Sequence, residues 1–199
     1  MSKAAATRLS ILHKAFELVY ANGYMTTSVD DIIAQTKVTK GAFYYHFKNK
    51  DEMGLAMIKE VLYPGMTDAL IKPLLSSKDS TTEIFKMMKS LLQDNPFFQV
   101  KYGCPAVNLI EEMGGTHAAF RKALSGLFNE WQNAIQQSLE QGKTSGELRK
   151  DIHPKQVALF IATGYGGIRN LGKLFGKDCY ALYLKELKVY LNGLRKNNP

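Results

Sequence analysis

Cysteine and histidine are scarce in this sequence of 199 residues, which has two cysteines and four histidines. Two cysteines do not make the disulfide framework of a small secreted domain. The histidines are scattered and form no His-Glu-x-x-His or Cys-His cluster, so we expect no metal site and no cofactor. The first residues do not resemble a signal peptide, and no apolar run is long enough to cross a membrane. These absences indicate a cytoplasmic protein with reduced thiols and no membrane partner.

Strand patterns and catalytic motifs are also missing. Apolar residues recur at helical spacing and no segment alternates like a β-strand, which predicts an all-α protein. Glu111 and Glu112 are adjacent on a predicted helix and therefore diverge, so they make a poor acid and base pair. Residues 164–167 resemble a dinucleotide-binding loop, but Arg169 replaces the third glycine and a helix precedes the run. The sequence therefore does not predict an enzyme.

Basic residues outnumber acidic ones, which gives a net charge of +8 and an isoelectric point near 9.3. Residues 1–50 hold seven basic and three acidic residues, a net charge of +4, and the remaining residues supply the other +4. The charge indicates a polyanionic partner, but its distribution does not locate a nucleic-acid site.

Residues 28–50 predict two short helices joined by a turn at residues 36–38. Ser28 and Thr39 are placed to cap these helices, and Asp30 and Asp31 lie in the first turn, where the helix dipole favours negative charge. Helices this short need a third helix to pack against. Residues 8–22 supply it, with Leu12, Ala15, Phe16 and Val19 on one stripe, Thr7 as its cap and residues 1–6 as a flexible arm.

The second short helix has the surface chemistry that DNA requires. Gly41 and Ala42 permit a close approach, their neighbours donate hydrogen bonds or positive charge, and no acid interrupts residues 35–50. The alternative is a solvated basic loop on a small helical domain. We predict a helix-turn-helix DNA-binding domain over residues 1–50 and a second domain over residues 51–199.

Three segments stand out in the first quarter of the chain: I-L-H-K-A-F-E-L-V-Y-A-N-G-Y at residues 11–24, T-T-S-V-D-D-I-I at residues 26–33 and V-T-K-G-A-F-Y-Y-H-F-K-N-K-D-E at residues 38–52. With these segments the chain resembles the tetracycline-repressor (TetR) family of transcriptional regulators. Lys37 is a mild departure, because a small residue often stands there in the family. The resemblance implies a homodimer on a palindromic double-stranded DNA operator.

The contacts with DNA are expected from the predicted helix starts and the second short helix. Base edges would be contacted by Thr39, Lys40, Gly41 and Ala42. Phosphates would be contacted by Thr7, Thr27, Tyr44, Tyr45, His46 and Lys50.

The second domain resembles the family more loosely, and the resemblance implies that it holds an effector pocket. A helix interrupted at Pro64 and Gly65 and an irregular aromatic segment at residues 97–103 favour a cavity over an ordinary core. The expected lining residues are Tyr63, Met66, Phe85, Met88, Phe97, Phe98, Tyr102, Val107, Ile110 and Trp131. The sequence does not identify the small-molecule effector.

The last two predicted helices, from Pro154 and from a cap at Asp178, are the expected dimer interface. Ala158, Ala162 and Gly166 recur every four residues and make a smooth face for close packing, joined by Tyr183, Leu187 and Leu191 of the last helix. The alternative is that these residues pack within one chain.

Cys104 precedes Pro105 at a predicted helix start, where the helix dipole would favour a thiolate, and Lys101 and Lys173 are candidate cationic neighbours. The alternative is a small buried residue that fills a gap. The sequence thus predicts a repressor released from its operator by a small molecule or by thiol modification. A dimeric DNA-binding regulator without an effector is the competing interpretation.

Overall fold

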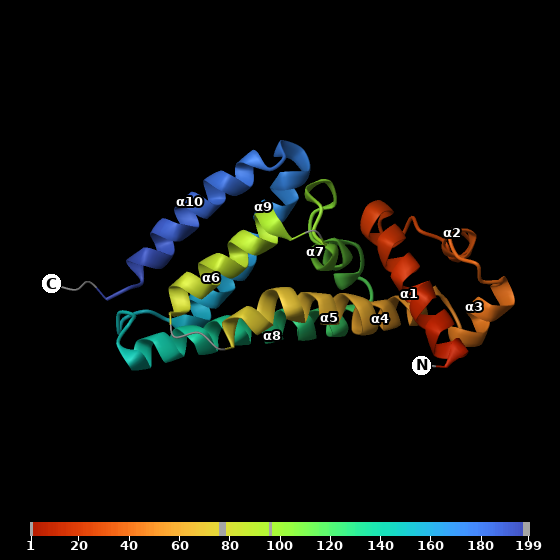
Figure 1. Cartoon of the computed structure of the whole chain (residues 1–199), viewed down its shortest axis with the longest axis horizontal. Coiled ribbons are helices and arrows are strands. Elements are labelled where there is room, and N and C mark those ends of the chain that lie inside the picture. The colour runs from red at the N-terminus through yellow and green to blue at the C-terminus, as the bar shows by residue number, and fades with distance from the viewer. Residues whose placement is uncertain (1, 76–78, 96, 197–199) are drawn as a thin grey trace. The chain divides into compact units, whose positions relative to one another are not determined.

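The computed structural model describes residues 2–75, 79–95 and 97–196 (Figure 1). Its elements are helices, and in these residues the strand-like hydrogen bonding is limited to one isolated bridge between Leu148 and Arg195. The predicted all-α fold is therefore confirmed. The sequence also predicts a linker at residues 76–80, of which residues 76–78 lie outside the described residues.

The chain divides into two compact units. Unit 1 holds Met1–Gly65 and Pro105–Gly126, and unit 2 holds Met66–Cys104 and Leu127–Pro199. Unit 1 is larger than the domain expected at residues 1–50, because α4 (Lys50–Met57) packs onto α1 (Lys3–Asn22) and the second segment packs onto the turn after α1. For example, the Phe120 ring lies 5.0 Å from the Tyr24 ring. Unit 1 is thus completed by residues that are distant in sequence.

Unit 1 begins with α1 (Lys3–Asn22), α2 (Val29–Ala34), α3 (Lys40–His46) and α4 (Lys50–Met57). A π-helical turn at Ile58–Leu62 leads into α5 (Tyr63–Met66), and the second segment holds α7 (Pro105–Leu109), a π-helical turn at Ile110–Gly114 and the start of α8 (Ala118–Ser145). The expected stripe of α1 is confirmed, since Leu12, Ala15, Phe16 and Val19 are all buried.

Two of the predicted helix caps are confirmed. Ser28 and Asp31 form a reciprocal capping box on α2, and the Thr39 hydroxyl accepts a hydrogen bond from the Ala42 amide at 3.2 Å. Each cap is worth about 1 kcal/mol. The prediction for α1 was wrong: Ser2 is its cap, and Thr7 lies within the helix, where its hydroxyl donates to the Lys3 carbonyl at 3.0 Å. Residues 3–6 are helical because Lys-Ala-Ala-Ala favours helix strongly.

Unit 2 contains a π-helical turn at Thr67–Ile71, a 3-10 turn at Lys72–Leu74, α6 (Ser80–Lys89), a π-helical turn at Ser90–Asp94, a 3-10 turn at Val100–Tyr102, the rest of α8, α9 (Pro154–Phe175) and α10 (Asp178–Gly193). The helix interruption expected at Pro64 and Gly65 takes the form of π-helical turns on either side of α5.

Three boundaries that the sequence predicts in unit 2 were wrong. The sequence predicts that a helix opens at Thr81 or Thr82, but α6 starts at Ser80, because Asp79 caps it by accepting from the Thr82 amide at 2.9 Å. The sequence also predicts a polar loop from Gly142 to His153, but α8 continues to Ser145 and shortens this loop. Asp178 is the first residue of α10, and Lys177 takes the predicted cap position.

Candidate functional sites

The outward face of α3 carries the four predicted base contacts. Thr39, Lys40 and Gly41 are exposed and Ala42 is half-buried, whereas Phe43 anchors the opposite side of the helix in the core of unit 1. A Cβ added to Gly41 would meet no atom within 4 Å, so this surface is open to another molecule. Among the predicted phosphate contacts, Tyr44 and Tyr45 are 48% and 79% exposed and His46 is half-buried.

Lys40 forms an exposed ion pair with Asp30 of α2, with 2.9 Å between Nζ and Oδ1. The hydrogen bond from Lys40 to Asp30 raises the pKa of the lysine. An exposed pair of this kind is weak, so Lys40 can leave Asp30 for a base at little cost.

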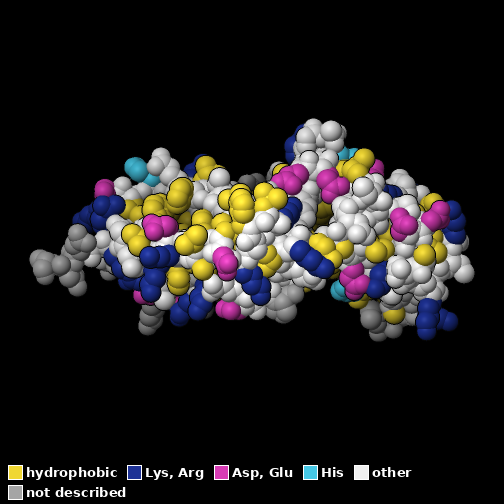
Figure 2. Space-filling view, turned by 90° about the horizontal axis from the view of Figure 1, so that it is seen from above, with side chains coloured by type: hydrophobic (Ala, Val, Ile, Leu, Met, Phe, Trp, Pro, Cys, Tyr) yellow, Lys and Arg dark blue, Asp and Glu magenta, His cyan; other side chains and the backbone are white. Residues whose placement is uncertain are grey.

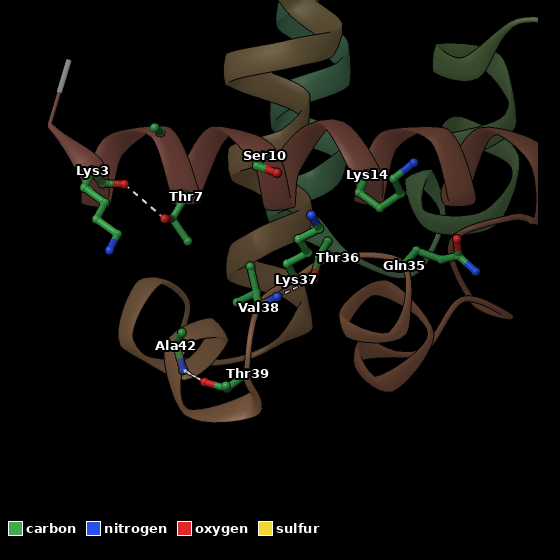
Figure 3. A pocket seen from close by; sticks show the side chains of 11 residues that line it. Lys3, Thr7, Ser10, Lys14, Gln35, Thr36, Lys37, Val38, Thr39 and Ala42 are labelled. Carbon is green, nitrogen blue, oxygen red and sulfur yellow. Dashed lines mark hydrogen bonds between the residues drawn. The ribbon is translucent and has the colours of Figure 1, made fainter.

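A hollow of about 670 Å³ lies between α1 and the turn that leads into α3 (Figure 3). Figure 3 shows Thr7 and Ser10 on α1 and Lys37 projecting from the turn toward that helix. We call this region the basic hollow, lined by Lys3, Ala6, Thr7, Ser10, Lys14, Gln35, Thr36, Lys37, Val38, Thr39 and Ala42. These described lining residues include three lysines, four hydroxyls and no acid. Lysines and hydroxyls are the groups that contact a DNA phosphate backbone.

The basic hollow includes residues that were not predicted as phosphate contacts. Lys3, Thr7, Ser10 and Lys14 recur every three or four residues, so they lie on one side of α1. This spacing was a usable signal in the sequence. Of the predicted phosphate contacts, Thr7 is the one that lines the hollow.

Two other predicted phosphate contacts are held inside unit 1. The Thr27 side chain is only 3% exposed, and its hydroxyl donates to the Gly23 carbonyl at 2.7 Å. Its assignment as a phosphate-contacting side chain was therefore wrong. The Lys50 ammonium lies 4.4 Å from the centre of the Tyr24 ring and 3.4 Å from the Met25 carbonyl oxygen. Burial lowers the pKa of Lys50, as expected for an ammonium drawn toward the protein.

Glu112 joins the second segment of unit 1 to the turn between α1 and α2. Its carboxylate accepts hydrogen bonds from the backbone amides of Tyr24 at 3.0 Å and Met25 at 2.8 Å. The Tyr24 hydroxyl in turn donates to Asp51 at 2.7 Å, and His117 Nε2 lies 3.3 Å from the same carboxylate. The structure thus gives Glu112 a specific role that its sequence position did not suggest.

The expected effector residues are divided between the two units. Met66, Met88, Phe98 and Trp131 of unit 2 are buried, and Phe85, Phe97 and Tyr102 are half-buried. Tyr63 and Val107 of unit 1 are half-buried, and Ile110 is 39% exposed. The Trp131 indole donates to the Met87 sulfur at 3.4 Å. The pocket itself stays a prediction.

The buried Arg169 was missed as a functional candidate. Its Nη2 donates to the carbonyls of Gln99, at 3.3 Å, and Gly103, and its Nη1 lies 3.5 Å from the Leu91 carbonyl. In the sequence, Arg169 was noted only because it stands where a dinucleotide-binding loop would have its third glycine. Its partners are 66 to 78 positions away, so no local pattern could identify them.

Cys104 follows Gly103 and is completely buried. The α-helical stretch after it has only five residues, which weakens the argument for a thiolate stabilised by a helix dipole. Lys173 does lie close, because a Cβ on Gly103 would collide with its Cε, and the φ of 72° at Gly103 also favours glycine. Lys101 lies over the Tyr102 ring at 4.4 Å.

The residues expected at the dimer interface pack mainly within the chain. Ala158, Ala162, Leu187 and Leu191 are each at most 6% exposed, while Gly166 and Tyr183 are half-buried. The intrachain alternative therefore fits the four buried residues, whereas Gly166 and Tyr183 stay predicted interface residues. Close packing occurs instead at Gly164 and Gly172, where any Cβ would collide with the hydroxyl groups of Tyr183 and Tyr180.

A different face of α9 and α10 is apolar and exposed. We call it the apolar face, and its residues are Leu159, Phe160, Leu171, Leu174, Phe175, Leu182 and Val189, each at least 45% exposed. On the view in Figure 2, hydrophobic side chains gather on the side of the molecule where α10 lies. Exposed apolar side chains in this number favour a protein interface.

The described residues hold neither a metal-binding cluster nor a membrane-spanning helix. Nowhere in residues 2–75, 79–95 and 97–196 do three or more His, Cys, Asp or Glu side chains form a group that could hold a metal ion. No helix in these ranges has both the length and the apolar character that a membrane span requires.

Both parts of the chain match known families. The profile described as bacterial regulatory proteins of the tetR family matches residues 11–57, and the tetracyclin repressor-like C-terminal domain matches residues 82–184. An uncharacterized HTH-type transcriptional regulator of Lactococcus lactis is 32% identical over 133 residues, which are 67% of this chain and 68% of that protein. The transcriptional regulator AcuR of Cereibacter sphaeroides is 29% identical over 171 residues, covering 82% and 75% of the two chains.

A solved structure shows the same fold over the whole chain. The TetR-family regulator of Cytophaga hutchinsonii has a TM-score of 0.88 and 21% identity, and the match covers 100% of this chain and 99% of that one. Together with the α3 surface and the helical second unit, these matches establish that the chain belongs to the TetR family of DNA-binding transcriptional repressors.

Proposed function

We propose that this protein is a homodimeric repressor that binds a palindromic operator in the cytoplasm and releases it when a small molecule binds. The observation that carries the proposal is the basic hollow beside the open face of α3. A phosphate backbone in the hollow would leave α3 facing the edges of the bases. Members of this family bind DNA and dimerise, and two copies on one duplex read two half-sites.

Lys40 is proposed to read a base. Replacing Lys40 with alanine should weaken binding to an operator selected from random oligonucleotides by about 1–3 kcal/mol and relax the preference at one position. Fluorescence anisotropy on the operator and on random DNA measures both effects. Lys89→Ala, an exposed lysine of α6, serves as the control. An equal loss on both DNAs would show that Lys40 contacts only phosphate.

Lys37 is proposed to bind phosphate in place of Lys50. Lys37 is exposed in the basic hollow, whereas Lys50 is held against Tyr24. Lys37→Ala should weaken operator and random DNA alike and reduce the slope of log affinity against log salt by about one unit. Lys50→Ala should change the slope less. A slope unchanged in Lys37→Ala and reduced in Lys50→Ala would reverse the assignment.

A conformational change that releases DNA is proposed to pass along the chain from residues 99–103 to Glu112. Arg169 holds the carbonyls of Gln99 and Gly103, and Glu112 lies nine positions after Gly103, where it binds the turn between α1 and α2. An effector that changes the conformation of residues 99–103 would therefore bias the position of Glu112. The effector would select between two states that the free protein already populates.

A small-molecule effector is favoured over thiol modification, because Cys104 is completely buried in the protein. Iodoacetamide labelling followed by mass spectrometry tests this order. Cys104 should label more slowly than the half-buried Cys179. Fast labelling of Cys104 with release of DNA would favour thiol modification instead.

A further inference from the structure

In the part of the chain that the structure describes, no carboxylate pairs with the buried guanidinium of Arg169. Its side chain is 0% exposed, and its described partners are three neutral carbonyls and the rings of Phe98 and Tyr180. Carbonyls satisfy N–H donors but do not neutralise the charge. Arginine cannot give up its proton in a protein, and buried charges are normally paired. The guanidinium of Arg169 is therefore a positive charge that no described carboxylate balances.

Hydrogen-bond donors next to this charge are also unused. Arg169 Nε and the Tyr180 hydroxyl are both buried and have no hydrogen-bond partner among the described residues. The two side chains are neighbours, since Arg169 Cζ lies 5.6 Å from the centre of the Tyr180 ring. Burial raises the pKa of Tyr180 and outweighs the opposite effect of Arg169, so the phenol stays protonated and can donate. Arg169 Nη1 has only a 3.5 Å contact with Leu91, at the limit of a hydrogen bond.

A purely structural role for Arg169 explains part of this arrangement. Holding the carbonyls of Gln99 and Gly103 would fix the loop before Cys104. The structural role does not explain why the positive charge is unbalanced. It also does not explain why Arg169 Nε and the Tyr180 hydroxyl have no hydrogen-bond partner among the described residues. A ligand that accepts hydrogen bonds and carries one negative charge accounts for all three.

We propose that the effector carries a carboxylate that binds Arg169 Nε and the Tyr180 hydroxyl. This inference rests on the proposed function, in which a small molecule controls DNA binding. A carboxylate matches the site because it has one negative charge and oxygens that accept from arginine in a planar arrangement. Phe98 lies 5.4 Å from Arg169 Cζ, so the rest of the ligand is expected to be apolar.

Calorimetry with simple acids and their neutral amides tests the proposal. The probes are acetate, propionate, hexanoate and benzoate, each paired with the matching amide at constant ionic strength. At least one acid should bind saturably and about tenfold or more tighter than its amide, because a charged hydrogen bond is lost in the amide. Equal binding of acid and amide, or no saturable binding of any acid in this set, overturns the proposal.

Tyr180→Phe tests the second contact with a change that preserves the fold. It removes only an unpartnered hydroxyl, so the protein without ligand should be as stable as before. The affinity for the acid should fall about fivefold. Tyr190→Phe changes a half-buried tyrosine of the same helix and should leave the affinity for the acid unchanged. An acid affinity that is the same in both variants would place the carboxylate elsewhere.

Arg169→Gln tests the charge. The preference for acid over amide should disappear, and if this variant does not fold, the acid–amide comparison and Tyr180→Phe decide the matter. Operator release is measured separately by anisotropy. An acid that binds at Arg169 without releasing DNA would support the site and contradict the proposed function. Release by a neutral compound, with no acid preference, would support the proposed function and overturn the carboxylate.

Discussion

Leu174→Arg should convert the protein to a monomer and abolish operator binding at concentrations where the wild type binds. Leu174 is 76% exposed on the apolar face of α9, so the arginine is tolerated by the single chain. In a dimer that buries this face, the same arginine would be an unpaired buried charge costing several kcal/mol. Each monomer would contact only one half-site, and the gain in affinity from binding two half-sites at once would be lost.

Sedimentation velocity and circular dichroism separate this outcome from unfolding. Leu174→Arg should sediment as a monomer with the helicity of the wild type. Leu75→Arg is the matched control, because Leu75 is 65% exposed and lies outside α9 and α10. It should remain dimeric. A dimeric Leu174→Arg would locate the interface away from the apolar face.

Ala162→Arg should disturb the packing of the single chain, unlike Leu174→Arg. The sequence places Ala162 at the expected dimer interface, where such a change would separate the subunits and leave the helices intact. Ala162 is only 6% exposed, so an arginine there must disturb the packing inside the chain. The reason for the error is that α9 is apolar on two sides. Periodicity shows that a face is apolar but does not say whether α10 or a second chain covers it.

The helix-turn-helix was predictable because its signals are local. Ser28 caps α2 through Asp31, three positions later, and Thr39 caps α3 through the Ala42 amide, also three positions later. The stripe on α1 follows helical spacing. The caps and the stripe depend on neighbours within a few turns, which a sequence displays directly.

The parts that were missed depend on long-range contacts. Thr27 was expected at a phosphate because it lies near the start of α2, but its hydroxyl turns back to Gly23. Glu112 and its partner Tyr24 are 88 positions apart. Arg169 and Gly103 are 66 apart. Such pairs are created by the packing of units assembled from separate segments, so no pattern along the chain announces them.

Glu112→Ala should lower the stability of unit 1 much more than the truncation of an exposed carboxylate does. The change leaves the amides of Tyr24 and Met25 without their acceptor. Losing two charge-assisted hydrogen bonds should reduce the free energy of unfolding by about 2–4 kcal/mol. For a chain of this size, the midpoint of thermal unfolding should fall by roughly 5–15 °C.

Two comparisons test whether the carboxylate oxygens themselves are responsible. Glu130→Ala removes an exposed carboxylate from α8 and should leave the midpoint nearly unchanged. Glu112→Gln keeps one acceptor oxygen and should fall between the wild type and Glu112→Ala. Operator affinity should weaken in the same order, because the turn at Tyr24 and Met25 sets the path of the chain into α2. A Glu112→Ala midpoint equal to that of Glu130→Ala would mean that Glu112 does not hold the turn in solution. The proposed path from residues 99–103 to the DNA-binding helices would then lose its last link.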